Sequence, residues 1–204
     1  MHITTLPLGP LGANCYIVSD GACCAVIDPG DNGPALHDAL RGLTVSAILL
    51  THGHFDHVGG VRALQAETGA PVYLSSHDLS LPAELSGGLP AEFTDLSQEA
   101  ASAITVGSIT FDVLETPGHC PGSVCFWAKD GQQEALFTGD TLFQGSMGRT
   151  DFPGGDLTAM QLSLQRLSQL PPSLAVYPGH GPASTIGDER RWNPFLRPFV
   201  GRED

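Results

Sequence analysis

The residues with the clearest chemistry lie in one short segment, residues 51–57, with the sequence THGHFDH. Four of its side chains can bind a metal ion, and they fall within six residues: His52, His54, Asp56 and His57. In an extended loop, residues 52, 54 and 56 project to the same side, and His57 points toward a second position. So many ligand-type side chains after an apolar run and before a helical pattern favour a metal site over a solvated polar loop.

Three further segments place a single ligand-type side chain in a glycine-containing turn after an apolar run. Their sequences are TPGH, which ends at His119, FTGD, which ends at Asp140, and YPGH, which ends at His180. One such turn is weak evidence of function. Because the strand ends of α/β folds usually host the functional site, the three turns together predict that these side chains share a site with residues 51–57.

The elements that must position these residues form an alternating pattern of short strands and helices. Strands are expected over 15–19, 23–28, 45–50, 71–74, 104–106, 109–114, 123–127, 135–138 and 174–177. Helices are expected over 34–41, 58–68 and 157–170, with Asp156 as the N-cap of the last. Residues 86–101 are acidic and poor in large apolar side chains, which predicts a mobile surface excursion. The pattern predicts one α/β domain over 1–204, built of two similar halves, roughly 1–115 and 116–204.

Composition narrows the class of protein. The 204 residues are 41% hydrophobic and 15% charged, which is typical of a globular domain. Nine Lys plus Arg against 22 Asp plus Glu give a net charge of −13, which disfavours a nucleic-acid partner. No apolar run reaches the roughly 18 residues of a membrane span, and no signal peptide is apparent, so we expect no membrane partner. Five cysteines without a C-x-x-C pair indicate free thiols and a cytoplasmic location.

The THxHxDH pattern, followed by single His, Asp and His in later turns, resembles the metallo-β-lactamase superfamily over essentially the whole chain. The resemblance implies an α/β fold, a four-layered αβ/βα sandwich with a two-metal site along one edge. It implies one metal position formed by His52, His54 and His119, and a second formed by Asp56, His57 and His180.

Two further roles follow from the same resemblance. Asp140 would bridge the two metal ions through its carboxylate. Asp28 would orient a ligand histidine from behind, since such partners fix the tautomer and the ring direction. The alternative for Asp28 is that it only initiates the Asp28-Pro29-Gly30 turn.

Narrower motifs are similar to the short glyoxalase II-like hydrolases. These motifs are GDTLF from Gly139, GRTDFPGGD from Gly148, GHGP from Gly179 and NPF from Asn193. The longer glyoxalase II enzymes add a C-terminal helical domain that helps bind glutathione, and we expect this chain to lack it. They also carry Lys and Tyr where this sequence has Arg149 and Asp151. The resemblance therefore implies the hydrolytic site more strongly than the glutathione-binding residues.

Five imidazoles and two carboxylates suit two divalent metal ions, zinc first, with iron or manganese also tolerated. Two such ions can hold a bridging hydroxide as the nucleophile and polarise a carbonyl group. A thioester then needs no dedicated general acid, because its leaving thiolate has a pKa of about 8.5. We therefore expect a binuclear hydrolase of a small-molecule thioester such as hydroxyacylglutathione, with Asp56 and Asp140 as catalytic carboxylates.

Two residues near the motifs allow more than one interpretation. Arg149 is the candidate cation for a substrate carboxylate, and an internal pair with Asp151 or Asp156 is the alternative. Cys120 adjoins His119, but successive side chains usually point apart. We therefore expect Cys120 to be a neighbour of the site and not a metal ligand.

Other activities of the same fold remain alternatives. A mononuclear iron persulfide dioxygenase shares the GRTDF segment and would use only His52, His119 and Asp140. Its usual His-Asp-Tyr differs from the HGP sequence that begins at His180 here, which disfavours it. Another ester or lactone hydrolase is a further alternative, and a β-lactamase is disfavoured because such enzymes normally carry export signals.

Overall fold

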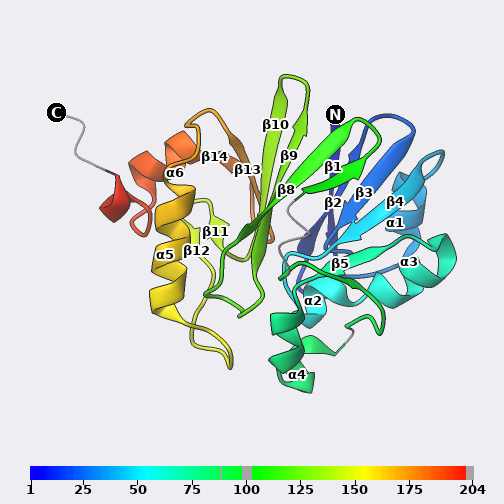
Figure 1. The fold of residues 1–204 in the computed structure, drawn as a ribbon, viewed down its shortest axis with the longest axis horizontal. Coiled ribbons are helices and arrows are strands. Elements are labelled where there is room, and N and C mark those ends of the chain that lie inside the picture. The colour runs from blue at the N-terminus through cyan, green and yellow to red at the C-terminus, as the bar shows by residue number, and fades with distance from the viewer. Residues whose placement is uncertain (88, 98–102, 201–204) are drawn as a thin grey trace.

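The computed structural model describes residues 1–87, 89–97 and 103–200, and two six-stranded sheets form its centre (Figure 1). The first sheet contains, in spatial order, β1 (His2–Leu8), β2 (Ala13–Ser19), β3 (Cys23–Ile27), β4 (Thr44–Leu49), β5 (Val72–Leu74) and β6 (Thr94–Asp95). The second contains β14 (Ser184–Thr185), β13 (Ala175–Pro178), β10 (Gln133–Gly139), β9 (Val124–Asp130), β8 (Ile109–Glu115) and β7 (Ala103–Val106). The sheets divide the described chain between β6 and β7, ahead of the boundary near residue 115 expected from the sequence.

Helices cover the outer face of each sheet (Figure 1). The first sheet is covered by α1 (Pro34–Ala39), α2 (Phe55–Val58) and α3 (Val61–Thr68), and the second by α5 (Leu157–Leu167) and α6 (Ile186–Trp192). The smaller elements are η1 (Ser76–Ser80), α4 (Ala83–Ser86), the hairpin β11 (Leu142–Phe143) and β12 (Ser146–Met147), and η3 (Arg197–Phe199).

The side-chain alternation of the strands explains these layers. On β4, Ala47 and Leu49 face the other sheet, whereas Ile48 packs against the helices. On β10, Phe137 enters the same inter-sheet core and Leu136 packs under α5. Both sheets are therefore buried on both faces, and the four-layered αβ/βα architecture expected from the sequence is confirmed.

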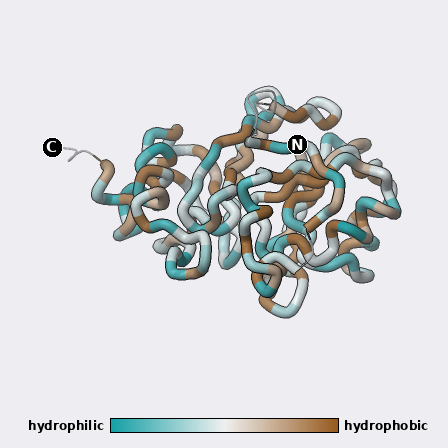
Figure 2. Tube along the Cα trace, turned by 60° about the horizontal axis from the view of Figure 1, so that its bottom comes forward, coloured by the Kyte–Doolittle hydropathy of each residue, from teal (hydrophilic) through white to brown (hydrophobic). Residues whose placement is uncertain are grey.

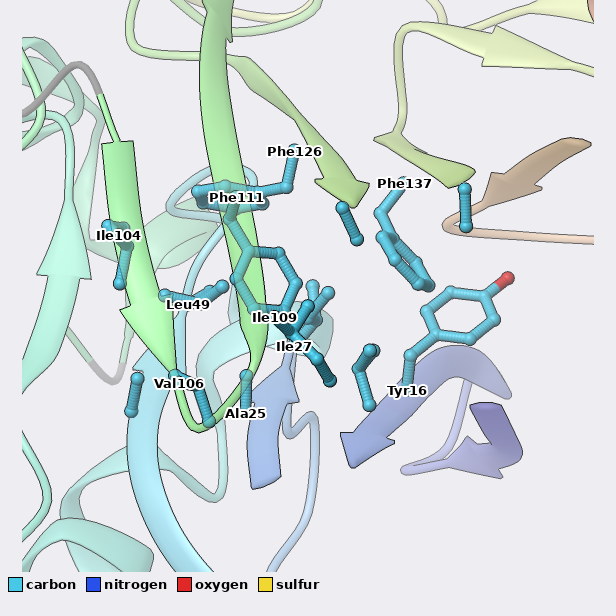
Figure 3. Packing of buried hydrophobic residues seen from close by; sticks show 14 of the residues in the cluster. Tyr16, Ala25, Ile27, Leu49, Ile104, Val106, Ile109, Phe111, Phe126 and Phe137 are labelled. Carbon is cyan, nitrogen blue, oxygen red and sulfur yellow. The ribbon is translucent and has the colours of Figure 1, made fainter. Parts of the chain in front are cut away.

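The core between the sheets is rich in aromatic side chains. Figure 3 shows Phe111, Phe126 and Phe137 from the second sheet facing residues of the first, Tyr16 among them. The rings of Tyr16 and Phe137 have centroids 5.0 Å apart. Along the Cα trace, brown hydrophobic stretches alternate with teal hydrophilic ones (Figure 2). This packing fixes the two sheets against each other and so sets the position of their strand ends.

Strand register brings the turns that follow the strands together. In the first sheet, β3 and β4 are parallel and Ile27 pairs with Leu49, so Asp28 and the segment after β4 leave the sheet at the same edge. In the second sheet, β10 and β13 are parallel and Gly139 pairs with Pro178. Asp140 therefore leaves β10 beside the turn that follows β13.

The expected helix over 58–68 differs from the structure. The chain already turns into a helix at Phe55, and Gly59 and Gly60 divide α2 from α3. A Cβ on Gly60 would lie 2.5 Å from the carbonyl carbon of Asp31, so this close approach of two backbones requires glycine. Gly69, at φ 68°, ends α3 as predicted. Asp156 caps α5, accepting a hydrogen bond from the Ala159 N–H at 3.0 Å, as predicted.

The acidic segment 86–101 is not simply an excursion. Within it, Thr94 and Asp95 form β6 and pair with Tyr73 and Leu74 at the edge of the first sheet. Residues 88 and 98–101 of this segment lie outside the described residues. No helix in the described ranges is long and apolar enough to cross a membrane.

Candidate metal centre

Seven candidate ligands from five segments meet at the edge where the strand ends of the two sheets face each other. The first sheet supplies the segment after β4 and the first turn of α2, which together carry His52, His54, Asp56 and His57. The second sheet supplies the turns after β8, β10 and β13, which carry His119, Asp140 and His180. Backbone hydrogen bonds join these turns: the Gly179 N–H donates to the Gly139 carbonyl at 2.8 Å, and the Asn14 N–H donates to the Gly179 carbonyl at 2.7 Å.

One cluster contains His52, His54, His119 and Cys120, and we call its three histidines position 1. Nδ1 of His54 lies 2.8 Å from Nε2 of His119, and the His52 ring is centred 4.9 Å from each of the other two rings. All three side chains are buried. Two ring nitrogens this close repel each other unless a proton or a metal ion lies between them.

A second cluster, position 2, contains Asp56, His57 and His180. Oδ2 of Asp56 lies 3.2 Å from Nε2 of His180 and 3.7 Å from Nε2 of His57. Asp56 and His57 are buried, whereas 31% of the His180 side chain is exposed. Position 2 is therefore the part of the site that is open to solvent.

Asp140 lies between the two positions. Its Oδ1 is 3.4 Å from Nε2 of His57, and its Oδ2 is 3.6 Å from Nε2 of His119 and 3.8 Å from Nε2 of His180. A Cβ on Gly179 would overlap Asp140 Oδ1, so only glycine lets this carboxylate reach its place. Oδ1 thus faces position 2, and Oδ2 lies near ligands of both positions.

The donor atoms fit bound metal ions. Nε2 of His52, Nε2 of His57 and Oδ1 of Asp140 are buried and have no hydrogen-bond partner in the described structure. Buried polar atoms are rarely left without a partner, because desolvation then costs about 1–3 kcal/mol each. Imidazole and carboxylate are the ligands of zinc, iron and manganese. The two clusters therefore have donor atoms suited to metal ions, and three of these atoms are buried without a hydrogen-bond partner.

Hydrogen bonds behind the ligands hold their rings in the required tautomer. Asp28 accepts from Nδ1 of His57 at 3.0 Å and from the Thr51 hydroxyl at 2.6 Å. With its proton given to Asp28, the Thr51 hydroxyl accepts from Nδ1 of His52 at 3.0 Å. The carbonyl of Arg149 accepts from Nδ1 of His119 at 2.8 Å. Nε2 of each of these three histidines is left with a lone pair that points into the site.

The electrostatics differ between the two positions. Burial and the neighbouring imidazoles lower the pKa of His52 well below its usual range, and lower the pKa of His54 to about 4. Burial also opposes a charge on His57, but Asp140 and the hydrogen bond to Asp28 outweigh it and raise its pKa to about 9. A hydrogen bond that Nε2 of His180 donates to the Asp56 carboxylate raises the pKa of His180. His52 and His54 are therefore held neutral, and position 2 attracts a cation.

Three expectations for the site change with the structure. Because α2 starts at Phe55, residues 52, 54 and 56 do not form one extended run, and Asp56 and His57 both reach position 2 from the first helical turn. Cys120 does not point away: its Sγ lies 3.4 Å from Nε2 of His54 and belongs to the donor cluster at position 1. A bend in the turn after β8 explains this, since Gly118 has φ 146°.

Arg149 forms the internal pair that was the alternative to substrate binding. Its guanidinium donates to both carboxylate oxygens of Asp151 at 2.8 Å and stacks over the Phe152 ring at 3.6 Å. Phe152 in turn lies 6.2 Å from the His54 ring. Asp28 also does more than initiate a turn, because it adopts φ 51° and contacts both Thr51 and His57.

Sequence reasoning missed Asp78, Phe143 and Phe152 as parts of this region. Phe143 lies 6.3 Å from the His180 ring, so one aromatic ring flanks each metal position. Asp78 is fully buried and accepts backbone hydrogen bonds from Gly53 and Gly122. The GDTLF and GRTDF motifs could have indicated the two phenylalanines, since both motifs adjoin a ligand-bearing turn, but no local pattern indicates Asp78.

The signature of the Metallo-beta-lactamase superfamily matches residues 8–180. The chain belongs to this superfamily, and the resemblance seen in its ligand motif is confirmed. Hydroxyacylglutathione hydrolase GloC of Haemophilus influenzae is 36% identical over 211 residues, covering 96% of this chain and 98% of that protein.

Two solved structures are similar over nearly their whole length. BLEG-1 B3 metallo-beta-lactamase has a TM-score of 0.85 at 39% identity, covering 96% of this chain and 99% of that chain. TTHA1623, in a di-iron-bound form, has a TM-score of 0.82 at 42% identity, covering 96% of this chain and 100% of that chain. With the donor clusters at the strand ends, these similarities define a hydrolase of the metallo-β-lactamase fold with a candidate metal centre.

Proposed function

We propose that the chain is a two-metal hydrolase of small-molecule thioesters of the hydroxyacylglutathione type. In this proposal position 1 (His52, His54 and His119) and position 2 (Asp56, His57 and His180) would each hold one ion, and Asp140 would be a ligand shared by both. The observation that carries it is the place of Asp140, whose two carboxylate oxygens lie 3.4 Å from Nε2 of His57 and 3.6 Å from Nε2 of His119. We propose zinc as the metal, with iron or manganese as substitutes.

The bound ions supply a water that ionises near neutral pH and a positive charge for the carbonyl oxygen under attack. The chain's own residues do the positioning. Asp28 and the Arg149 carbonyl keep Nδ1 of His57 and His119 protonated, so both Nε2 atoms face the site. The carboxylates of Asp56 and Asp140 can accept hydrogen bonds and so orient a water between the two positions. Phe143 and Phe152 place apolar rings beside the site.

A thioester matches what these residues provide. Among the ligands, their hydrogen-bond partners and the two flanking aromatic rings, no side chain is placed as a separate general acid. A leaving thiolate with a pKa of about 8.5 departs without one, whereas an amine leaving group does not. Similarity to GloC of Haemophilus influenzae supports a hydroxyacylglutathione among the substrates. The five free cysteines support a reducing, cytoplasmic setting for this activity.

Metal analysis combined with four assays tests the proposal. The purified chain is analysed for metal equivalents by element and assayed with a hydroxyacylglutathione thioester, its oxygen ester, a β-lactam and a glutathione persulfide in an oxygen electrode. We expect two equivalents of metal per chain and preferential thioester hydrolysis. One equivalent of iron with oxygen consumption would establish a persulfide dioxygenase instead, and faster turnover of the ester or the β-lactam would change the substrate class.

A pair of histidine variants separates the two-metal from the one-metal enzyme. His57→Ala removes a position 2 ligand that a mononuclear enzyme using His52, His119 and Asp140 would not need. The matched control is His37→Ala, because His37 lies outside the site and pairs with Glu67 at 2.9 Å. We expect His57→Ala to lose one metal equivalent and at least about 100-fold in rate, a loss of about 2.7 kcal/mol of transition-state stabilisation, and His37→Ala to lose neither.

A further inference from the structure

Asp78 is a buried acidic residue that the ligand set does not use. It lies in η1, in the connection between β5 and β6, and its side chain is fully buried. Its polar partners in the described part of the chain are two backbone N–H groups. Oδ2 accepts from Gly53 at 2.7 Å, and Oδ1 accepts from Gly122 at 2.6 Å.

These two glycines belong to the two loops that build position 1. Gly53 lies between His52 and His54, and Gly122 closes the turn that starts at His119. The loops come from different sheets and are far apart in sequence. One carboxylate therefore joins the segment that supplies two of the position 1 ligands to the segment that supplies the third.

Both loops are packed tightly onto the carboxylate. A Cβ on Gly53 would lie 3.0 Å from Cβ of Asp78, and a Cβ on Gly122 would lie 2.7 Å from its Oδ1. Neither loop can withdraw by rotating a side chain, because the contacts are made by backbone atoms. The separation of the two loops is thus set by the span between the two oxygens of one carboxylate.

Within the described residues the carboxylate of Asp78 forms no salt bridge, and the adjacent His77 is the one group whose charge lowers its pKa. Burial raises the pKa of this carboxyl group to about 6, against the hydrogen bonds from Gly122 and Gly53. The sequence has no Lys or Arg between Arg62 and Lys129. A buried carboxylate without an ion pair is costly, and the two charge-assisted hydrogen bonds offset part of that cost. An asparagine of the same shape would offer one acceptor and turn an N–H group toward the other N–H.

We propose that Asp78 is the positioning residue of position 1: it fixes the distance between the loop carrying His52 and His54 and the loop carrying His119, and thereby the affinity of that position for its metal ion. This inference rests on the ligand set of position 1 and not on the substrate. It predicts a selective effect, because position 2 draws its ligands from α2 and the turn after β13, which Asp78 does not contact.

The test measures Co²⁺ binding to the full-length protein by absorption spectroscopy and chelator competition. Asp78→Asn is made in a His180→Ala background, which leaves position 1, and in a His54→Ala background, which leaves position 2. We expect about 10- to 100-fold weaker Co²⁺ binding and altered d–d bands in the first background, and no change in the second. An unchanged affinity at position 1, or an equal loss at both positions, would overturn the proposal.

Two control variants separate positioning from general destabilisation. Asp20→Asn removes a comparable set of contacts, since the Asp20 carboxylate accepts hydrogen bonds from the backbone N–H groups of Ala22, Cys23 and Ser108, away from the site. Leu164→Ala, in the core under α5, lowers stability without touching a ligand loop. Both should leave Co²⁺ binding at position 1 unchanged. If Asp78→Asn does not fold, Gly122→Ala displaces the same hydrogen bond from the other side and should weaken position 1 alone.

If the wild-type chain binds one ion and hydrolyses no thioester, the proposed function fails while the Asp78 test can still be read at position 1. If it binds two ions and hydrolyses thioesters but Asp78→Asn behaves as wild type in both backgrounds, only the role of Asp78 fails. The two proposals are therefore tested separately.

Discussion

The two halves of the molecule build their share of the metal centre in different ways. The first half places four candidate ligands within one loop and one helical turn, residues 52–57. The second half places one candidate ligand after each of three strands, β8, β10 and β13. A local constellation can be recognised from spacing alone, whereas dispersed ligands are brought together only by sheet topology.

The two metal positions, each of which draws on both halves, also differ. Position 1 is buried, its His52 and His54 are neutral, and Asp78 accepts hydrogen bonds from both of its loops. Position 2 is held by Asp28 behind His57 and is exposed at His180. A closed position and an open one beside each other should differ in affinity and in the rate of metal exchange. Asp140, between them, is the one ligand whose loss should affect both.

The largest effect is therefore expected for Asp140→Ala. Removing the shared carboxylate should lower metal content at both positions and reduce turnover about 1,000-fold or more, a loss of about 4 kcal/mol of transition-state stabilisation. Metal content by element and kcat/KM on a thioester are the measurements. A variant that retained two ions and near-normal turnover would show that the seven residues are not a shared centre.

His180→Ala should separate the two positions. Because His180 is the exposed ligand of position 2, its loss should release one ion and leave position 1 loaded. We expect about 100-fold lower turnover, that is, a smaller loss than in Asp140→Ala. Chelator-competition titration resolves the two affinities. Retention of only the weaker ion would reverse the assignment of the closed and the open position.

Asp28→Asn should affect position 2 from behind. Oδ2 of Asp28 accepts from the Thr51 hydroxyl and from Nδ1 of His57, Oδ1 accepts from the Thr51 N–H, and an amide has only one oxygen to accept at these two places. Outer partners of metal ligands contribute about 10- to 100-fold to metal affinity, so we expect position 2 to weaken by that factor and position 1 by less. Weakening confined to position 1 would contradict the separate support of the two positions by Asp28 and Asp78.

The sequence predicts features that depend on local patterns, and it misses those that depend on contacts between residues far apart in the chain. His119, Asp140 and His180 were predicted because each follows an apolar strand and a glycine. β1 was not, since Leu8 is its only fully buried side chain and its pattern carries little alternation. The break between α2 and α3 was not predicted either. It depends on the close approach of the Gly60 and Asp31 backbones, a contact that no local pattern encodes.

The site residues divide in the same way. Cys120 was expected to point away from position 1, and the backbone of Gly118 at φ 146° turns it toward His54 instead. Asp78 was missed because its role consists of two backbone hydrogen bonds to loops from different sheets. Metal-ligand residues can be recognised from their types and spacing in the sequence. A residue such as Asp78, which sets the distance between two ligand loops, has no such pattern.

The smallest effect is expected at the rim of position 1, where Arg149 contacts Asp151. The pair is exposed, and exposed ion pairs contribute little to stability. If the guanidinium also receives a substrate carboxylate, Arg149→Ala should raise KM about two- to five-fold for a thioester bearing a carboxylate and leave a neutral thioester unchanged. Asp151→Asn should lower KM for the same anionic substrate, because it frees the guanidinium. Equal changes for both substrates would mean that the pair only stiffens its loop.

The dependence on salt and pH of KM for the carboxylate-bearing thioester extends this last prediction. A chain with a net charge of −13 repels an anionic substrate, so added salt should lower KM for the carboxylate-bearing thioester or leave it unchanged. The hydrogen bonds from Arg149 lower the pKa of Asp151 to about 2. The pair is therefore ionised at every pH from 5 to 8, and the effect of Arg149→Ala should be constant over that range. A KM that rises steeply with salt in the wild type and not in Arg149→Ala would instead reveal a cationic pocket centred on Arg149.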